Sequence, residues 1–410
     1  MVERPFALWR EPERLAEVLA EVAAEMLDAG AGALLPGAAA EVGAGAGARG
    51  GVGAAIELGP AAAMAITMTA ELADCFETKR AGVLAVLDAF SQAFPATPAW
   101  VYGTDGRFRA PAAARRAPGR VAAANWLAAA TWAARRHPDA LLLDVGSTTT
   151  DVVPLVAGRV AARGRTDTER LAAGELVYTG ALRTPVAALV RRVPLRRGWC
   201  RVAAEHFAIA ADAHRWLGRI GPAEYTCETP DARGTSRREC ARRLARVVCG
   251  DLESVTAAEV TAIARRVVEA QRRQIGAAIR QVLGRLGAAA PRVALAAGCG
   301  HRLAAEAARD AGLEPIALAE AWGAGGALAA PALAVACLLA ERWAGWPARD
   351  DEPASHAEPA SHAEPASHAE PARDAEPASH AEPARGDGGS EPGRHPRPAG
   401  GAPPAGAPDP

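Results

Sequence analysis

One run of residues, 141–155, narrows the possible folds more than any other stretch, and it reads LLLDVGSTTTDVVPL. An apolar strand ends at Asp144, turns through Gly146, and returns as a strand after Asp151. A tight hairpin with glycine lets backbone N–H groups approach a phosphate closely, and hydroxyl groups add further donors. A Walker loop would instead need G-K-[ST]. The sequence therefore predicts a phosphate-binding hairpin of Gly146, Ser147, Thr148, Thr149 and Thr150; the alternative is a turn whose hydroxyl groups only satisfy its own backbone.

The two carboxylates that flank this hairpin indicate a magnesium site. Mg²⁺ keeps several waters and prefers one or two carboxylates together with phosphate oxygens. Asp144 is the stronger candidate ligand and Asp151 the second. We therefore expect Mg²⁺ as a cofactor, held directly or through water.

Strand and helix patterns alternate along the rest of the chain. Short strands are expected at 65–69, 99–102, 140–144 and 292–297, and helices at 11–27, 80–94, 121–135, 237–286 (with interruptions) and 331–343. Such interleaving predicts a mainly parallel sheet with both faces covered. Residues 151–156 and 159–163 are expected as the second and third strands of a meander. The simplest arrangement is an α/β protein with two lobes around a cleft.

Composition allows a large core and points to small-molecule partners. Half of the 410 residues are apolar and the formal net charge is -1, so no global field would hold nucleic acid or an anionic membrane. The seven cysteines are odd in number and show no C-x-x-C spacing, which favours reduced thiols in the cytoplasm. No signal peptide opens the chain, and the apolar stretch 322–339 is expected to be a buried helix rather than a membrane span.

Low-complexity segments divide the chain into four parts. We expect a helical segment at 1–28, a Gly/Ala-rich insertion or linker at 29–60, an α/β core at 61–345 and a disordered tail at 346–410 that contains EPASHA repeats.

Acidic residues outside the hairpin provide further site candidates. Glu71 and Asp74 follow the first strand three residues apart, so they could project together toward a cleft, although acids in a first helical turn also serve as ordinary caps. Lys79, a lone lysine among arginines, is a candidate phosphate contact or a solvated surface residue. Asp167, Glu175 and Tyr178 share a polar stretch better explained by a cleft than by packing.

Two further patterns are weaker. His206, Asp212 and His214 have spacings that do not converge on one point of a helix, which favours substrate contact or structure over a metal site. Gly298 and Gly300 follow an apolar strand and precede a helix, as at many strand-to-helix turns.

Several stretches together resemble one protein family. Besides DVGSTTTD, these are ITMTAELADCF (66–76), RTDTERLAAGELVYTGALRTPV (165–186), EHFAIAADAHRWLG (205–218), PDARGTSRRECARRLARVVCGDL (230–252) and VALAAGCGHRLAAEAA (293–308). The sequence, over about 62–343, is similar to the hydantoinase/oxoprolinase-related family, and within it to tetrahydromethanopterin-linked C1 transfer proteins. The resemblance implies an actin-like ATPase (ribonuclease H-like) fold with two lobes, in which Gly298 and Gly300 approach a nucleotide base.

The same resemblance implies a transferase reaction. A phenol oxygen of a tyramine derivative would displace diphosphate from an aminomethylfuran diphosphate, forming an ether in methanofuran-type cofactor synthesis. Mg²⁺ at Asp144 and the hairpin would stabilise the departing diphosphate, and Glu71 or Asp74 would supply acid–base chemistry. ATP is not required for that reaction.

The family's first phosphate loop, D-x-G-G-x-x-x-K, does not occur in this sequence, so we expect the N-terminal phosphate hairpin to be missing. Three functions stay open: the condensing enzyme, with the missing segment upstream; an ATP-dependent small-molecule kinase or hydantoinase/oxoprolinase-type hydrolase; or a non-catalytic partner in a C1 pathway. A homo-oligomer is compatible with each.

Overall fold

The computed structural model describes residues 6, 8–28, 63–196, 198–322 and 330–344. Contacts along the chain separate two units, Met1–Pro353 and Ala354–Pro410, and all described residues belong to the first. The expected Gly/Ala-rich insertion and repeat tail lie outside the described residues.

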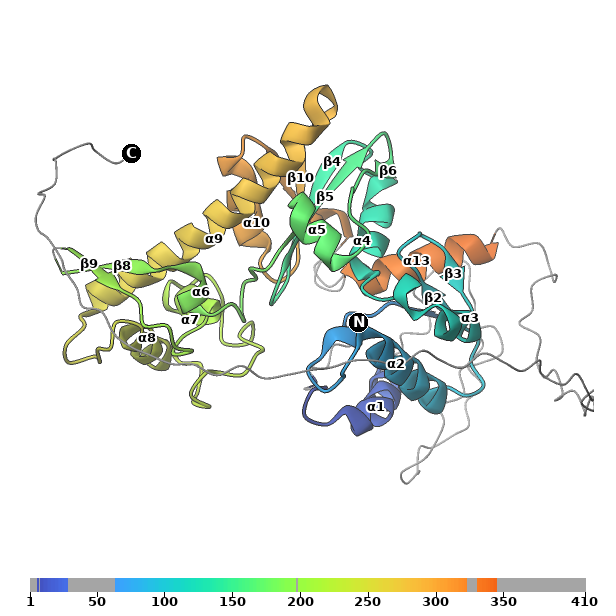
Figure 1. Ribbon diagram of the computed structural model, residues 1–410, viewed down its shortest axis with the longest axis horizontal. Coiled ribbons are helices and arrows are strands. Elements are labelled where there is room, and N and C mark those ends of the chain that lie inside the picture. The colour runs from blue at the N-terminus through green and yellow to red at the C-terminus, as the bar shows by residue number, and fades with distance from the viewer. Residues whose placement is uncertain (1–5, 7, 29–62, 197, 323–329, 345–410) are drawn as a thin grey trace, which may run out of the picture. The chain divides into compact units, whose positions relative to one another are not determined.

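A six-stranded sheet carries the hairpin (Figure 1). Its strands are β4 (Ala140–Val145), β5 (Thr150–Val156), β6 (Arg159–Val160), β7 (Leu176–Val177), β10 (Val293–Ala297) and β11 (Glu314–Ala317). Their order is β11-β10-β4-β5-β6, with β7 also paired to β5. β11, β10 and β4 run parallel, whereas β5 is antiparallel to β4, β6 and β7. The expected meander is confirmed, but the sheet is mixed rather than mainly parallel, because two tight reversals follow β4.

Alternating side chains of the central strands pack against helices on both faces of this sheet. Leu142 and Val153 face one cluster with α4 (Asn125–Ala134) and α11 (Leu318–Trp322). Leu141, Leu143 and Val152 face another cluster, with α9 (Ala257–Leu286) and α10 (His301–Asp310). A strand covered on both faces has to be apolar on both, which explains the unbroken apolar run before Asp144.

A second, three-stranded sheet lies earlier in the chain. β1 (Met64–Ile66) pairs in parallel with β2 (Ala99–Tyr102), which pairs antiparallel with β3 (Phe108–Arg109). The helices of this region are α1 (Leu15–Asp28), α2 (Lys79–Ala93) and α3 (Pro111–Arg116). α4 packs against α13 (Ala330–Ala344), which in turn contacts β1, so the two sheets share one continuous set of helices (Figure 1).

Four of the remaining elements pack against α9: α6 (Val186–Leu189), α7 (Ala210–Trp216), α8 (Arg237–Arg246) and β8 (Arg192–Leu195), which forms a hairpin with β9 (Gly198–Arg201). The end of α5 (Asp167–Ala173) lies at the C-terminal half of α9, where Gln281 and Arg285 donate to the Ala172 and Ala173 carbonyl oxygens. Thr256 caps α9 through a capping box with Glu259. This arrangement confirms the long helical region with an interruption between α8 and α9.

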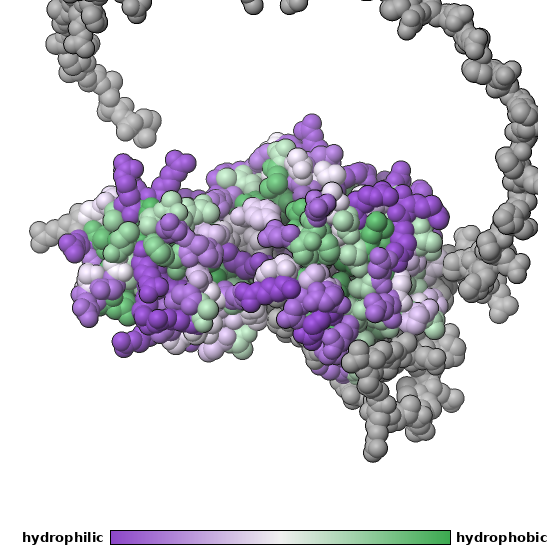
Figure 2. All heavy atoms as spheres, turned by 60° about the horizontal axis from the view of Figure 1, so that its bottom comes forward, coloured by the Kyte–Doolittle hydropathy of each residue, from purple (hydrophilic) through white to green (hydrophobic). Residues whose placement is uncertain are grey.

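None of the described helices is both long enough and apolar enough to cross a bilayer. The face drawn in Figure 2 carries polar side chains interspersed with small apolar patches, as the balanced net charge leads one to expect.

Candidate active site

The hairpin between β4 and β5 forms a short, closed loop. The strand register pairs Val145 with Thr150, leaving Gly146–Thr149 as the connection. The loop closes when the Gly146 N–H donates to the Thr149 carbonyl oxygen at 2.9 Å. The turn lies where the sequence predicts it.

The backbone of residues 181–183 donates hydrogen bonds to two carbonyl oxygens of the loop. The N–H of Ala181 donates to the Gly146 oxygen at 2.9 Å, and the N–H groups of Leu182 and Arg183 donate to the Ser147 oxygen at 3.1 and 2.8 Å. Gly180 makes this approach possible, because a Cβ there would lie 2.5 Å from Ser147 C. The segment 180–183 therefore fixes which way the loop peptides point.

The amide groups of the loop are left available. Within the described part of the chain, the N–H groups of Ser147, Thr148 and Thr149 donate to no protein acceptor. Successive N–H groups in a tight turn form a concave anion site. The hydroxyl group of Thr150, by contrast, is buried and donates to the Thr179 carbonyl oxygen at 2.6 Å. We therefore place Ser147, Thr148 and Thr149 in the candidate cradle and give Thr150 a structural role.

The two flanking carboxylates face the same side of the sheet. Asp144 and Asp151 are directly paired across β4 and β5, so their side chains lie together on the α4 face. Burial, and to a smaller extent the negative charge of Asp151, raises the pKa of Asp144 to about 7. Among the described residues, nothing donates a hydrogen bond to the Asp144 carboxylate, so its oxygens are available to a cation.

Asp151 is already paired, through a residue that sequence reasoning missed. Arg170 in α5 is 1% exposed and lies 2.8 Å from the Asp151 carboxylate. Its guanidinium also donates to the Glu175 carbonyl oxygen at 2.8 Å and stacks on the Trp126 ring. No local pattern marks an arginine in an amphipathic helix as buried, because its partners are distant in sequence. Because its carboxylate is paired with Arg170, Asp151 is better placed to stabilise the strands around the site than to bind a metal directly.

The glycine turn after β10 packs directly beside Asp144. A Cβ on Gly298, which has φ +80, would lie 2.4 Å from Asp144 Oδ1, and one on Gly300 would lie 2.3 Å from the Val145 side chain. The Gly300 N–H donates to the Val145 carbonyl oxygen at 2.8 Å. Glycine is thus needed at both positions, and the turn borders the same strand ends as the hairpin.

The expected pair Glu71 and Asp74 does not come together. Glu71 is 2% exposed, and its Oε2 has no hydrogen-bond partner in the described structure, whereas Asp74 is exposed. The short 3₁₀ turn Ala70–Leu72 ends before Asp74, so the two side chains do not share a helical face. Burial raises the pKa of the Glu71 carboxyl, and the charge of Asp167 adds to this effect.

Lys79 and Asp167 lie close to Glu71 and pair with each other. Lys79 Nζ is 2.7 Å from Asp167 Oδ2, across α2 and the start of α5, and both side chains are partly exposed. Lys79 thus has an internal ion-pair partner in the structure.

Glu175 and Tyr178 have very different surroundings. The Glu175 carboxylate is fully buried, accepts from the N–H groups of Arg163 and Gly164 at 2.6 and 2.9 Å, and pairs with Arg285. Its oxygens are therefore engaged internally. Tyr178 is 61% exposed, directly after the strand that pairs with Asp151, and its ring is accessible to a ligand.

A buried hydrogen-bond chain supports the hairpin from the other face. Arg219 Nε donates to His214 Nδ1 at 3.1 Å, so Nε2 carries the proton and donates to Gln271 Oε1 at 2.9 Å. The Gln271 amide then donates to the Gly180 carbonyl oxygen at 2.7 Å and to Thr179 Oγ1 at 3.1 Å. Burial lowers the pKa of His214 to about 4.

The other members of the His/Asp group do not join His214 at a metal site. Asp212 is buried in a pair with Arg243 at 2.7 Å and accepts from Tyr225, while His206 is exposed. No cluster of three or more His, Cys, Asp or Glu side chains suited to a metal occurs within the described ranges.

The sequence model of the hydantoinase/oxoprolinase family matches residues 40–342, and the chain belongs to that family.

Two curated relatives narrow the resemblance. Both are named (4-{4-[2-(gamma-L-glutamylamino)ethyl]phenoxymethyl}furan-2-yl)methanamine synthase. The protein from Methanocaldococcus jannaschii is 40% identical over 204 residues, which are 50% of this chain and 61% of the relative. The protein from Methanococcus vannielii is 40% identical over 124 residues, which are 30% of this chain and 55% of the relative. The chain therefore matches less than two thirds of the length of each.

Among solved structures, nucleotide-free acetone carboxylase gives a TM-score of 0.41 at 12% identity, over 63% of this chain and 37% of that one.

Proposed function

We propose that this protein is a transferase that condenses an aminomethylfuran diphosphate with a tyramine derivative, releasing diphosphate, in methanofuran-type cofactor synthesis for tetrahydromethanopterin-linked C1 transfer. The observation that carries the proposal is the row of unpartnered amides at Ser147–Thr149 beside the carboxylate of Asp144. The synthase named for both relatives joins a phenol to a furanmethyl group, and their similarity supports the same chemistry here.

The proposed fold is the two-lobed, actin-like ATPase type. Support comes from the strand order β11-β10-β4-β5-β6, in which an antiparallel hairpin meander adjoins parallel strands, and from the glycine turn after β10. The three-stranded sheet β1-β2-β3 would belong to the other lobe.

The residues present fit a magnesium ion. Asp144 offers a carboxylate to which none of the described residues donates a hydrogen bond, and cradle-bound phosphate oxygens would complete a donor set that Mg²⁺ prefers. Mg²⁺ bound there would supply charge neutralisation for the departing diphosphate. Asp151, held by Arg170, would act through water. We further propose that the protein works in the cytoplasm, which the seven free cysteines favour.

In the proposed reaction, backbone amides and one carboxylate of this protein have separate roles. The amides of Ser147–Thr149 bind the diphosphate oxygens as the bond from the furanmethyl carbon to the leaving oxygen breaks. The phenol oxygen forms the new bond to that carbon, and its proton passes to a carboxylate. We propose Glu71 for this role over Asp74, because Glu71 is buried, has a free oxygen and has a raised pKa.

Mutation of Asp144 tests the proposal. Isothermal titration of the furan diphosphate with Mg²⁺ should show binding to the wild-type protein, and Asp144→Asn should weaken it at least about tenfold because the carboxylate beside the loop amides loses its charge. Asp139→Asn, which lies just before β4 and so at the opposite end from Asp144, is the matched control and should bind normally. Mass analysis of products with the tyramine derivative completes the test. Equal binding by wild type and Asp144→Asn would remove the cradle from the function.

The same titration separates the alternatives that the sequence leaves open. Tight binding of ATP, without binding of the furan diphosphate, would favour an ATP-dependent kinase or hydrolase of this fold. Binding of neither ligand would favour a non-catalytic partner in the C1 pathway.

A further inference from the structure

The backbone of Gly180, beside the loop, is held by two buried side chains. Its N–H donates to Thr184 Oγ1 at 2.9 Å, and its carbonyl oxygen accepts from the Gln271 side-chain amide at 2.7 Å. Thr184 follows four residues later in the chain, whereas Gln271 comes from the middle of α9. Gln271 is the only polar residue among the buried residues of α9, and burying a polar group is unfavourable unless it is hydrogen-bonded. Its hydrogen bonds therefore account for its place in the helix.

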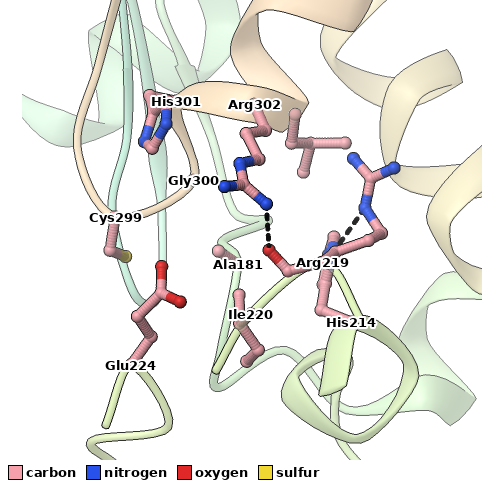
Figure 3. Close-up of a pocket in the computed structure, with 10 residues that line it drawn as sticks. Ala181, His214, Arg219, Ile220, Glu224, Cys299, Gly300, His301 and Arg302 are labelled. Carbon is pink, nitrogen blue, oxygen red and sulfur yellow. Dashed lines mark hydrogen bonds between the residues drawn. The ribbon is translucent and has the colours of Figure 1, made fainter. Parts of the chain in front are cut away.

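The orientation of the Gln271 amide is fixed by its neighbours. Arg219 Nε can only donate, so His214 Nδ1 is the acceptor in the bond between them, which Figure 3 shows. His214 Nε2 then donates to Gln271 Oε1 at 2.9 Å. Both amide N–H groups are left for the Gly180 carbonyl oxygen and for Thr179 Oγ1, the latter at 3.1 Å. Only one orientation of the amide satisfies all three bonds.

Gly180 in turn lies against the peptide bond between Ser147 and Thr148. A Cβ added to Gly180 would be 2.5 Å from Ser147 C and 2.5 Å from Thr148 N. This peptide carries the Thr148 N–H, the central amide of the candidate cradle. Because interiors packed this closely transmit displacements, a shift of the Gly180 backbone would change the direction of that N–H group.

We propose that Gln271 is a positioning residue for the cradle: its amide holds the Gly180 carbonyl oxygen, and Gly180 sets the direction of the Thr148 N–H. The inference rests on the proposed function and deepens it, because it says how the loop amides are kept in place for a diphosphate. Gln271 acts through Gly180 rather than on the diphosphate, since α9 packs on the face of the sheet opposite to Asp144.

Titration of Mg²⁺ and inorganic diphosphate into the full-length protein tests this role with two variants. Gln271→Met has about the same volume and removes both N–H donors, whereas Gln271→Glu keeps the shape and sets a second acceptor against the Gly180 carbonyl oxygen. Each should weaken diphosphate binding at least about tenfold.

Two changes elsewhere in α9 are the matched controls. Gln274→Glu adds the same charge at a half-buried position, and Ile263→Ala removes core packing about two turns earlier in the helix. Both should bind diphosphate normally at a temperature where circular dichroism shows that they are folded. Unchanged affinity in both Gln271 variants would overturn the proposal.

The coupling between Gln271 and Gly180 is a readout that general destabilisation would not change. In Gly180→Ala, the added Cβ displaces the loop directly. If Gln271 acts through Gly180, combining Gln271→Met with Gly180→Ala should weaken diphosphate binding less than about threefold beyond Gly180→Ala alone. Independent effects would multiply to about a hundredfold, and that result would overturn the proposal.

The amide resonances of Thr148 and Thr149, observed in protein labelled with ¹⁵N-threonine, keep the two proposals apart. They should shift in Gln271→Met and stay in place in Ile263→Ala. Such shifts in a protein that binds no diphosphate would refute the proposed function and support the positioning role. Diphosphate binding with unchanged affinity and unchanged resonances in Gln271→Met would refute the positioning role alone.

Discussion

Gly180 shows how one missing side chain shapes the candidate cradle. Its Cα lies so close to the hairpin that an added Cβ would be 2.5 Å from both Ser147 C and Thr148 N. These are backbone atoms of a closed loop, which cannot rotate away as a side chain would. The direction of the loop amides therefore depends on glycine at this position.

We predict that Gly180→Ala displaces the hairpin and weakens diphosphate binding at least about tenfold, at a stability cost of about 1–3 kcal/mol from overpacking. Titration of diphosphate and denaturant unfolding measure the two effects. Gly234→Ala, where an added Cβ meets nothing within 4 Å, is the control and should change neither. Normal diphosphate binding by Gly180→Ala would show that the loop does not need this contact.

Arg170 is a buried residue whose side chain, unlike that of Gly180, contributes a contact: its charge pairs with Asp151 beside the candidate site. We predict that Arg170→Met destabilises the fold by about 3–5 kcal/mol, because Asp151 would then be a partly buried charge without a partner. Arg280→Met, at an exposed position on α9, should stay within about 0.5 kcal/mol of wild type. Urea unfolding of both variants gives the comparison, and similar midpoints would contradict the prediction.

At the residue scale, the sequence predicts a site at Asp144 and the loop because the expected chemistry follows from local order along one hairpin. It does not identify Arg170, Gly180 or Gln271, whose roles depend on partners that are distant in the chain. Glu71 and Asp74 look equivalent in sequence, and only burial distinguishes them.

At the scale of elements, α7 and α9 support the hairpin through a bond between two buried side chains. His214 in α7 donates to Gln271 in α9, and Gln271 donates to the turn at Thr179–Gly180. The chain needs a neutral imidazole, because Arg219 already donates to Nδ1. This requirement makes the packing of the two helices sensitive to acid.

We predict that His214 contributes acid sensitivity to the free energy of unfolding. Its pKa is about 4 in the folded protein against an ordinary 6.5, so the unfolded chain takes up the proton first as the pH falls. Stability should be unaffected above about pH 6.5 and fall by about 3 kcal/mol between pH 6.5 and 4 from this group alone. In His214→Gln, which cannot titrate, unfolding free energies should fall by that much less over the same range. Parallel pH profiles for both proteins would contradict the prediction.

The elements themselves follow from the sequence to different degrees. β2 has the expected bounds, β4 and β5 differ by a single residue at one end, and α2 is shifted by one residue at both ends; apolar runs and the cap at Thr78 mark these elements clearly. α4 begins at Asn125 rather than 121, since Ala123 adopts a left-handed backbone that interrupts the helix. An alanine-rich stretch gives no warning of such a break, because alanine favours helix throughout.

At the scale of the whole molecule, few charged contacts join the region of the small sheet to α5. Lys79 to Asp167 is one, and Arg165 donating to the Thr104 carbonyl oxygen at 3.2 Å is another. Most of the remaining attachment is the apolar packing of α4 and α13. The α/β class follows from the alternating patterns, but the mixed sheet order depends on long-range pairing that no local pattern specifies.

We predict that Lys79→Met changes the free energy of unfolding by less than about 1 kcal/mol, because a partly exposed ion pair contributes little in water. Thermal unfolding at low and high salt measures this. A loss of several kcal/mol would mean that this pair, rather than α4 and α13, holds the two regions together.

The position of the hairpin in the middle of the six-stranded sheet also has a consequence for solvent exchange. β4 and β5 each have neighbours on both sides, so most of their amide hydrogens should exchange with deuterium only through large opening events. The N–H groups of Ser147, Thr148 and Thr149 have no acceptor among the described residues and should exchange quickly in the protein without ligand. An anion bound to the loop would slow the exchange of those three amide hydrogens, while the strand amides on either side would already exchange slowly. The change in exchange rate would therefore show which residues bind the anion.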